Sequence, residues 1–343
     1  MAAVVNTAAG PSTYHRRHQL IRPVSSPLSD GKETNGGEAR ADCVQDYSPC
    51  TCSVNVYNEI YVTCSGVSVE TVRDVFKRVN DPEIYELTLY PLADYTNTVT
   101  LLLDFFGNTS VTGNIGIYGN PLGNPGYPNL VVDPFAFSSS QNSLTRFYVK
   151  YFDFGMQKDF NFLNGFSKLK ILAVSGVINL TAFQYLPPLP SLQWLDVAYC
   201  PDLNQIAFPD LSPAKLKYLY LSHSEISDEK ADEIVAKLAA STSADSLEWL
   251  ILSDNSLTRI LSQVGSAFPK ITDIVLDNNK ISHIPSSSLT FAHPLQYLTL
   301  YENGIKTIES GAFQGKSTSV HASIFFFMLT TICFYRKFYN DSC

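Results

Sequence analysis

The sequence predicts an α/β repeat solenoid, in which short repeats stack and each contributes one strand to a parallel sheet on the concave side. Three observations support this fold class. An apolar pattern returns about every 24 residues, and the apolar positions inside each copy alternate as they do in a strand. In addition, 45% of the 343 residues are apolar, which is enough for a continuous core.

The repeat has the form L-x-x-L-x-L-x-x-N-x-L, and its central alternation places two side chains on one face of a short strand. Two weak copies, at Ile84 and Ile115, bring the number of repeats to about nine over residues 81–315. The clear copies are 25, 23, 24, 31, 24 and 24 residues apart and begin at Leu144, Leu169, Leu192, Leu216, Leu247, Ile271 and Leu295.

The asparagine of the repeat follows the strand at a bend. Its amide can bond backbone groups that the sheet leaves unpaired, so we expect Asn255, Asn279 and Asn303 to be structural. Cys200 occupies the same position in its repeat, which predicts a buried, unreactive thiol. We also expect a convex column of aromatic rings at Phe166, Phe268 and Phe291.

The 31-residue interval contains a predicted helix that begins after Ser227, a residue type that caps helix N-termini. Its apolar stripe predicts that it packs inward on the convex side, through Ala231, Ile234, Val235, Leu238 and Ala239.

These repeats resemble the leucine-rich repeat family, whose members fold as a horseshoe with a parallel concave sheet and a mostly short irregular or helical convex side. The resemblance covers roughly residues 84–315. It is similar to the extracellular type found in adhesion proteins, Toll-like receptor ectodomains and small leucine-rich proteoglycans, which carries an N-terminal cysteine cap.

Four cysteines, Cys43, Cys50, Cys52 and Cys64, lie just before the first repeat. Their spacing lacks paired C-x2-4-C motifs and intervening histidines, so two disulfides are favoured over a zinc site, with three pairings open. The family resemblance implies a cap over residues 43–80 with Cys43 paired to Cys52 and Cys50 to Cys64. Disulfides indicate an oxidising compartment.

The remaining sequence signals bear on localisation. Residues 1–42 predict a disordered leader in which no signal peptide is legible. The tail, residues 316–343, contains an apolar stretch at 320–335 that fits either a short transmembrane segment or an unrelated tail. Glycosylation sequons at Asn108 and Asn179, and a third at Asn340, are compatible with secretion. We expect an extracellular or cell-surface protein.

Strand positions between the buried leucines predict the side chains of the concave face. The column before the second leucine of each repeat contains both tryptophans of the protein. We expect an exposed aromatic stripe flanked by acids to bind a protein ligand of basic or polar character, although aromatic residues also simply suit strands. The predicted ligand face consists of Tyr148, Trp194, Asp196, Tyr218, Tyr220, Trp249, Asp273, Asp277 and Tyr297.

Composition and motifs argue against other functions. The net charge is −8 and no basic run exceeds a pair, so a nucleic-acid partner is not expected. The chain has no phosphate loop, nucleophile elbow or zinc-protease motif, so we expect neither an enzyme nor a metal or cofactor site. The sequence predicts recognition of a protein ligand in cell adhesion or innate immunity. A structural matrix protein and an intracellular leucine-rich inhibitor remain the alternatives.

Overall fold

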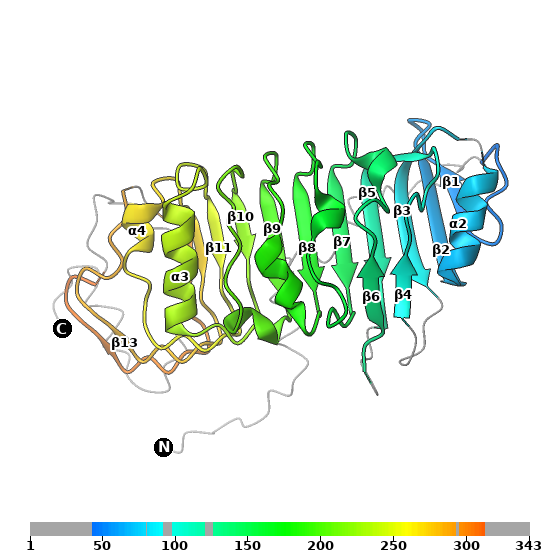
Figure 1. Ribbon diagram of the computed structural model, residues 1–343. Coiled ribbons are helices and arrows are strands. Elements are labelled where there is room, and N and C mark those ends of the chain that lie inside the picture. Colours follow the sequence, from blue (N-terminus) through cyan, green and yellow to red (C-terminus); the bar gives the residue numbers. More distant parts are fainter. Residues whose placement is uncertain (1–42, 80, 92–97, 121–125, 293–294, 313–343) are drawn as a thin grey trace, which may run out of the picture. The chain divides into compact units, whose positions relative to one another are not determined.

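The computed structural model describes residues 43–79, 81–91, 98–120, 126–292 and 295–312. Most of its strands join one eleven-stranded sheet in the order β1-β2-β3-β5-β7-β8-β9-β10-β11-β12-β14, with the larger helices along one face (Figure 1). β1 (Thr51–Val54) runs antiparallel to β2 (Ile60–Val67), and every later pair is parallel. The other strands of the sheet are β3 (Glu83–Pro91), β5 (Ser110–Tyr118), β7 (Arg146–Lys150), β8 (Ile171–Ser175), β9 (Trp194–Ala198), β10 (Tyr218–Tyr220), β11 (Trp249–Ile251), β12 (Asp273–Val275) and β14 (Tyr297–Thr299).

The predicted repeat solenoid is confirmed, and the sheet register shows why it is stable. The second leucine of each repeat pairs across the sheet with its counterpart in the next repeat, from Leu87 in β3 to Leu298 in β14. Every side chain of this column is at most 4% exposed. Each repeat therefore covers the apolar face of its neighbour, which one repeat alone would leave in water.

The bends after β11, β12 and β14 are held by the consensus asparagines. Asn279 Nδ2 donates to the carbonyls of Leu252 (2.9 Å), Leu276 (3.0 Å) and Asp277 (3.1 Å), and its Oδ1 accepts from the Leu257 N–H (3.0 Å). One side chain thus bonds four backbone groups in two repeats, as predicted. Asn255 and Asn303 make corresponding bonds.

Two smaller side chains, those of Ser224 and Cys200, bond the backbone at the corresponding bends of the two preceding repeats. Ser224 Oγ donates to the carbonyls of Ser222 (3.0 Å) and Val197 (3.3 Å). Cys200 Sγ lies 3.2 Å from the Ala198 carbonyl oxygen and is fully buried. Burial raises the pKa of this thiol to about 12, and the prediction that Cys200 is buried is confirmed.

Earlier repeats use a second backbone ladder that the sequence analysis did not predict. β4 (Thr98–Leu101) pairs in parallel with β6 (Asn129–Val132), and isolated bridges continue the pairing from Asn129 to Asp153 and from Asp153 to Ile178. Val177 and Phe152 occupy the asparagine position here and cannot hydrogen-bond through their side chains. The backbone groups pair with each other instead. A short parallel pair also joins β13 (His283–Ile284) and β15 (Thr307–Ile308).

Phenylalanine rings fill the space between the sheet and the convex side. Phe166 and Phe268 are buried and Phe291 is half-buried. The larger feature, which we did not predict, is a chain of ring contacts with centroids 5.2 to 6.2 Å apart. We call it the phenylalanine spine, and it consists of Phe106, Phe137, Phe162, Phe160, Phe183 and Phe208.

Helices lie on the face that carries this spine. The predicted inserted helix is α3 (Asp228–Ala239), and Ser227 Oγ caps it by accepting from the Lys230 N–H. Its stripe is buried as predicted, except that Ala239, the last residue of α3, is exposed. The other helices are α2 (Val69–Arg78), α4 (Val264–Ala267) and the 3₁₀ helices η2 (Ser138–Ser140), η3 (Asn161–Leu163), η4 (Leu180–Tyr185) and η5 (Pro201–Asn204).

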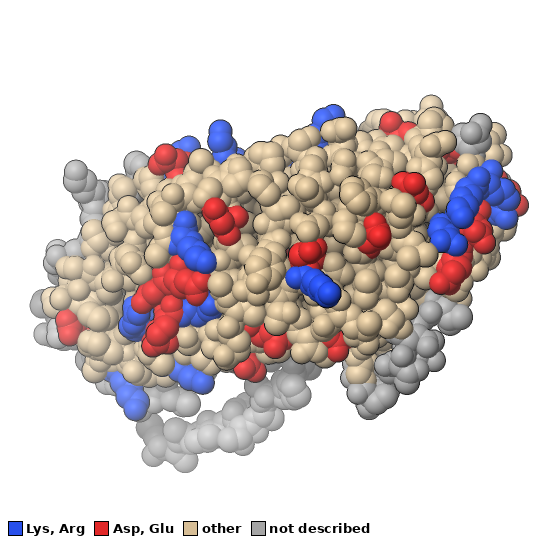
Figure 2. All heavy atoms as spheres, in the orientation of Figure 1, with Lys and Arg blue, Asp and Glu red and all other residues tan. Residues whose placement is uncertain are grey.

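Charged side chains on the helix-bearing face gather mainly over α2 and around α3, with a long, sparsely charged stretch between (Figure 2). Around α3 they form ion pairs, including Lys230 with Glu233 and Arg259 with Asp232. No helix in the described ranges has the length and apolar character needed to cross a bilayer. The predicted leader, the 320–335 segment and Asn340 lie outside the described residues.

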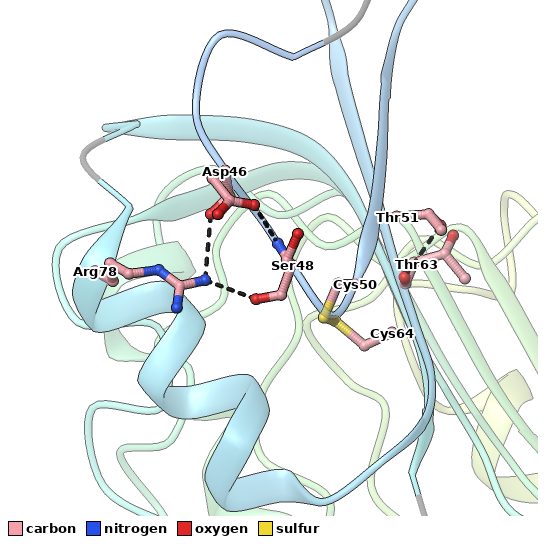
Figure 3. The surroundings of a disulfide bond; sticks show 7 residues. All are labelled: Asp46, Ser48, Cys50, Thr51, Thr63, Cys64 and Arg78. Atoms are coloured by element: carbon pink, nitrogen blue, oxygen red, sulfur yellow. Dashed lines mark hydrogen bonds between the residues drawn. A yellow bond between two sulfur atoms is a disulfide. The ribbon is translucent and has the colours of Figure 1, made fainter.

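The cysteine-rich segment lies at the N-terminal end of the sheet (Figure 1), and Figure 3 shows the disulfide between Cys50 and Cys64 within it. Disulfides join Cys43 to Cys52 and Cys50 to Cys64, the pairing that the family resemblance implies. Arg78, at the end of α2, donates to the Ser48 carbonyl (2.6 Å) and ties the helix to the loop before Cys50. Together with the apolar face of α2, this segment covers the core at the first repeat.

Candidate functional site

The concave face, meaning the side of the eleven-stranded sheet that carries no helix, is the candidate site. The strand register places the predicted columns side by side as expected. The first column runs across the sheet as Glu86, Asn114, Arg146, Ile171, Trp194, Tyr218, Trp249, Asp273 and Tyr297.

Three aromatic rings from adjacent strands contact one another in this column. The centroids of Trp194 and Tyr218 are 4.8 Å apart, and those of Tyr218 and Trp249 are 5.5 Å apart in an edge-to-face arrangement. All three side chains are half-buried. We call them the aromatic cluster. It presents apolar area that is partly ordered before any partner arrives, which lowers the entropic cost of binding.

The two other tyrosines near this cluster are also half-buried. Tyr220 follows on β10, and burial raises the pKa of its hydroxyl to about 12. Tyr297 is separated from the aromatic cluster by Asp273, and burial raises its pKa as well. Both hydroxyls are therefore neutral hydrogen-bonding groups at physiological pH.

The N-terminal part of the concave face is covered by its own tyrosines. Tyr148 is only 6% exposed and packs with Tyr118 and Ala173 in an apolar cluster separate from the main core. Tyr90 stacks on Tyr118 with ring centroids 5.1 Å apart. The expected exposure of Tyr148 is therefore wrong, because neighbouring strands supply rings that cover it.

The three predicted acids differ in environment. Asp196, on β9, is desolvated by burial, which raises its pKa to about 7, although the positive charge of Lys150 opposes this. Burial also raises the pKa of the Asp273 carboxyl. Asp277 is only 5% exposed, and its Oδ1 accepts from the Tyr301 N–H (2.7 Å), so its expected exposure is wrong and it holds the next repeat.

Charge is divided unevenly along the concave columns. β7 contributes Arg146 and Lys150, whereas the concave positions of β9 to β14 contain acids and no lysine or arginine. At the margin of this acidic part, Lys217 pairs with Glu248 at 3.3 Å. The aromatic cluster therefore lies in a part of the sheet with negative electrostatic character.

A further row of side chains, which we did not predict, lies along one edge of the concave face. Tyr199, His223, Asp254 and Asn278 recur at the repeat spacing, and each has a positive φ of 51° to 56°. The rings of Tyr199 and His223 stack at 4.2 Å, and His223 Nε2 lies 3.4 Å from Asp254 Oδ2. The sequence signal that marks these residues is their regular spacing. We call this row the edge row.

The predicted glycosylation sites within the described residues, and one further ion pair, can also be located. Asn108 and Asn179 are both exposed, and Asn179 Nδ2 donates to Asp153 Oδ1 at 2.8 Å. His283 pairs with Glu309 at 3.1 Å. Within the described residues, no group of three or more His, Cys, Asp or Glu side chains is arranged to hold a metal ion.

A protein-family model and several known proteins are similar to parts of this chain. A family model described as leucine rich repeat matches residues 269–317. Mouse podocan is 33% identical over 164 residues, which are 46% of this chain and 25% of podocan. Human lumican is 32% identical over 139 residues, covering 40% of this chain and 38% of lumican. A rabbit lumican sequence is 31% identical over 139 residues, covering 40% of this chain and 67% of that protein.

The chain belongs to the leucine-rich repeat family. The disulfide-linked N-terminal cap identifies it as the extracellular, cysteine-capped type of leucine-rich repeat protein. It spans a quarter of the length of podocan and 38% of that of human lumican. Among solved structures, a chain from the Drosophila Toll–Spatzle complex is similar with a TM-score of 0.42 and 9% identity, covering 78% of this chain and 39% of that one.

Proposed function

We propose that this leucine-rich repeat protein acts outside the cell, as a secreted or cell-surface molecule, and binds a protein ligand through the concave face of β9 to β14. The observation that carries the proposal is the aromatic cluster of Trp194, Tyr218 and Trp249, which is half-buried on a face that no helix covers. Rings of this kind supply most of the binding energy in many protein interfaces. Cell adhesion and innate recognition are the corresponding roles.

Two further observations support this proposal over its alternatives. The disulfides of the cap disfavour an intracellular inhibitor, because thiols are kept reduced in the cytosol. The acidic character of β9 to β14 favours selective recognition of a partner, whereas a purely structural role would not require such a division of charge.

A photocrosslinking experiment with the full chain would identify the ligand. We would place p-benzoylphenylalanine at Tyr218 and, as a matched control, at Tyr185 in η4, whose side chain is 59% exposed. Both proteins are presented to cells and extracellular fluid. We expect one protein to be crosslinked from position 218 and not from position 185.

Affinity measurements then test the face itself. Replacing both Trp194 and Trp249 by alanine should weaken binding of the crosslinked protein by at least about tenfold, while the melting temperature stays close to that of the wild type. Tyr185→Ala should change neither quantity. A large fall in melting temperature with unchanged affinity would show that the aromatic cluster is packing and would contradict the proposal.

A further inference from the structure

Of the buried side-chain atoms that have no hydrogen-bond partner among the described residues, two lie two strands apart at the same level of the concave face. They are Asp196 Oδ1 on β9 and Tyr148 Oη on β7. The register places Ala173 of β8 directly between these two residues. Buried polar groups are almost always bonded, so two unpartnered ones separated by a methyl group indicate a missing partner.

The protein's own cations do not fill this position. Lys150 attracts Asp196 electrostatically, but it lies two strands away and forms no ion pair with it within the described part of the chain. β8, between them, contributes only the small side chains of Ala173 and Ser175 at the corresponding positions. The carboxylate of Asp196 therefore lacks a neutralising contact.

The surroundings define the chemistry of the missing group. Asp196 in its charged form only accepts hydrogen bonds, and a tyrosine hydroxyl can also accept one. Trp194 precedes Asp196 on the same face of β9, and Tyr220 pairs with Asp196 from β10. Aromatic faces beside a carboxylate attract cations with long apolar stems.

We propose that Asp196 receives a lysine or arginine side chain of the protein ligand, with Tyr148 Oη as a second acceptor and the rings of Trp194 and Tyr220 beside its stem. This inference rests on the proposed function and assigns the ligand a basic anchor residue. The cation approaches from the β10 side, because Lys150 repels it from the β7 side. The acidic concave positions of β9 to β14 extend the same charge complementarity.

The first test uses small probes on the full chain. Acetyl-arginine amide and acetyl-lysine amide are titrated while backbone amide resonances are followed by NMR, with acetyl-citrulline amide as the neutral control of matched shape. We expect saturable shifts near residues 148, 173, 196 and 220 with the cationic amides only. Equal binding of citrulline, or no binding of the cationic amides, would overturn the proposal.

Variants sharpen this test. Asp196→Asn keeps the size of the side chain and should weaken acetyl-arginine amide at least about tenfold, whereas Asp254→Asn, in the edge row, should leave it unchanged. Ala173→Lys places an ammonium between Asp196 and Tyr148 and should also block the probe. Lys150→Met should strengthen binding of acetyl-arginine amide, because it removes a repelling charge. Weaker binding would mean that Lys150 itself contacts the ligand, and would contradict the proposed site for a cation.

The crosslinked protein ligand separates this inference from the proposed function. If the Trp194 and Trp249 double variant loses affinity while Asp196→Asn retains it, recognition through the aromatic cluster stands and the cation anchor is overturned. If both lose affinity, both are supported. If the tryptophan variant binds normally, the proposed function fails, and the result with Asp196→Asn decides the anchor separately.

Discussion

The repeats before Leu192 and those from Leu192 onward meet the same structural need in different ways. In the later region, asparagine side chains such as Asn279 bond the backbone groups that the bends leave unpaired. In the earlier region, Phe152 and Val177 occupy that position, and the backbone forms a second ladder through Asp153. The consensus asparagine is therefore one solution to backbone pairing, and a repeat can lose it when neighbouring segments pair directly.

The two regions also differ in what stabilises the core and what remains open on the concave face. The earlier region contains most of the phenylalanine spine and covers its concave face with Tyr118 and Tyr148. The later region has few buried rings but leaves the aromatic cluster and several acids half-buried. The earlier region therefore contains most of the ring packing, and the residues proposed to bind the ligand lie in the later region.

The largest expected effect concerns the spine. Phe160 contacts the rings of Phe154, Phe162 and Phe183, whereas Phe268 is equally buried in the later region without a ring contact in the described residues. Phe160→Ala should lower the free energy of unfolding by about 4 kcal/mol, and Phe268→Ala by about 1 kcal/mol less, because ring pairs add to burial. Urea unfolding of both variants measures the difference, and equal losses would show that the spine adds nothing beyond burial.

The next effect compares the two solutions at the bend. Asn279→Ala leaves the carbonyls of Leu252, Leu276 and Asp277 without their donor, and should cost about 3 kcal/mol. Val177→Ala, at the corresponding position of the earlier region, removes only packing and should cost about 1 kcal/mol. The same unfolding measurement applies. A larger loss for Val177→Ala would contradict the account of the ladder.

The third effect lies at the boundary of the two regions, in Asp196. Burial raises its pKa from 3.8 to about 7, so between pH 4 and pH 7 the native state binds more protons at this site than the unfolded state. Stability contributed by this group therefore falls as pH rises through that range. The free energy of unfolding of Asp196→Asn should equal that of the wild type near pH 4. At pH 8 it should be roughly 2 kcal/mol higher, a value that allows for the partial exposure of the side chain. A stability difference that does not change between pH 4 and pH 8 would contradict the burial of this carboxyl.

Ligand binding should show the opposite pH dependence at the same residue. A cation binds the charged carboxylate, so affinity for acetyl-arginine amide should fall roughly 20-fold from pH 7.5 to pH 5.5. Asp196→Asn should remove this dependence, and His223→Gln, which removes the nearby imidazole, should not. The titratable groups electrostatically linked to Asp196 from its own and adjacent elements are Tyr148 and Lys150 on β7, Tyr220 on β10, and Tyr199 and Cys200 just after β9.

The smallest effect concerns modification within the earlier region. Asn108 is exposed, whereas Asn179 Nδ2, the atom that would carry a glycan, is bonded to Asp153. Glycan occupancy in secreted protein should be higher at Asn108, and Asp153→Ala should raise it at Asn179. Glycopeptide mass spectrometry measures both sites. Full occupancy at Asn179 in the wild type would show that this hydrogen bond does not protect it.

The sequence predicts the features that depend on spacing and misses those that depend on neighbouring strands. The repeated motif fixes the register even across the 31-residue interval, so the column from Trp194 to Tyr297 is predicted correctly. Burial of Tyr148 depends on Tyr118, which belongs to a weak repeat and carries no consensus signal. The second ladder through Asp153 could not be predicted either, because backbone pairing leaves no pattern of side chains in the sequence.

Hydrogen exchange of the full chain with and without the protein crosslinked from position 218 tests the central claim most directly. The account predicts that added protection concentrates in β9, β10 and β11 and in the edge row that follows them, with little change in β3 to β7. Protection confined to α3 or to the earlier strands would contradict recognition through the concave face of the later region.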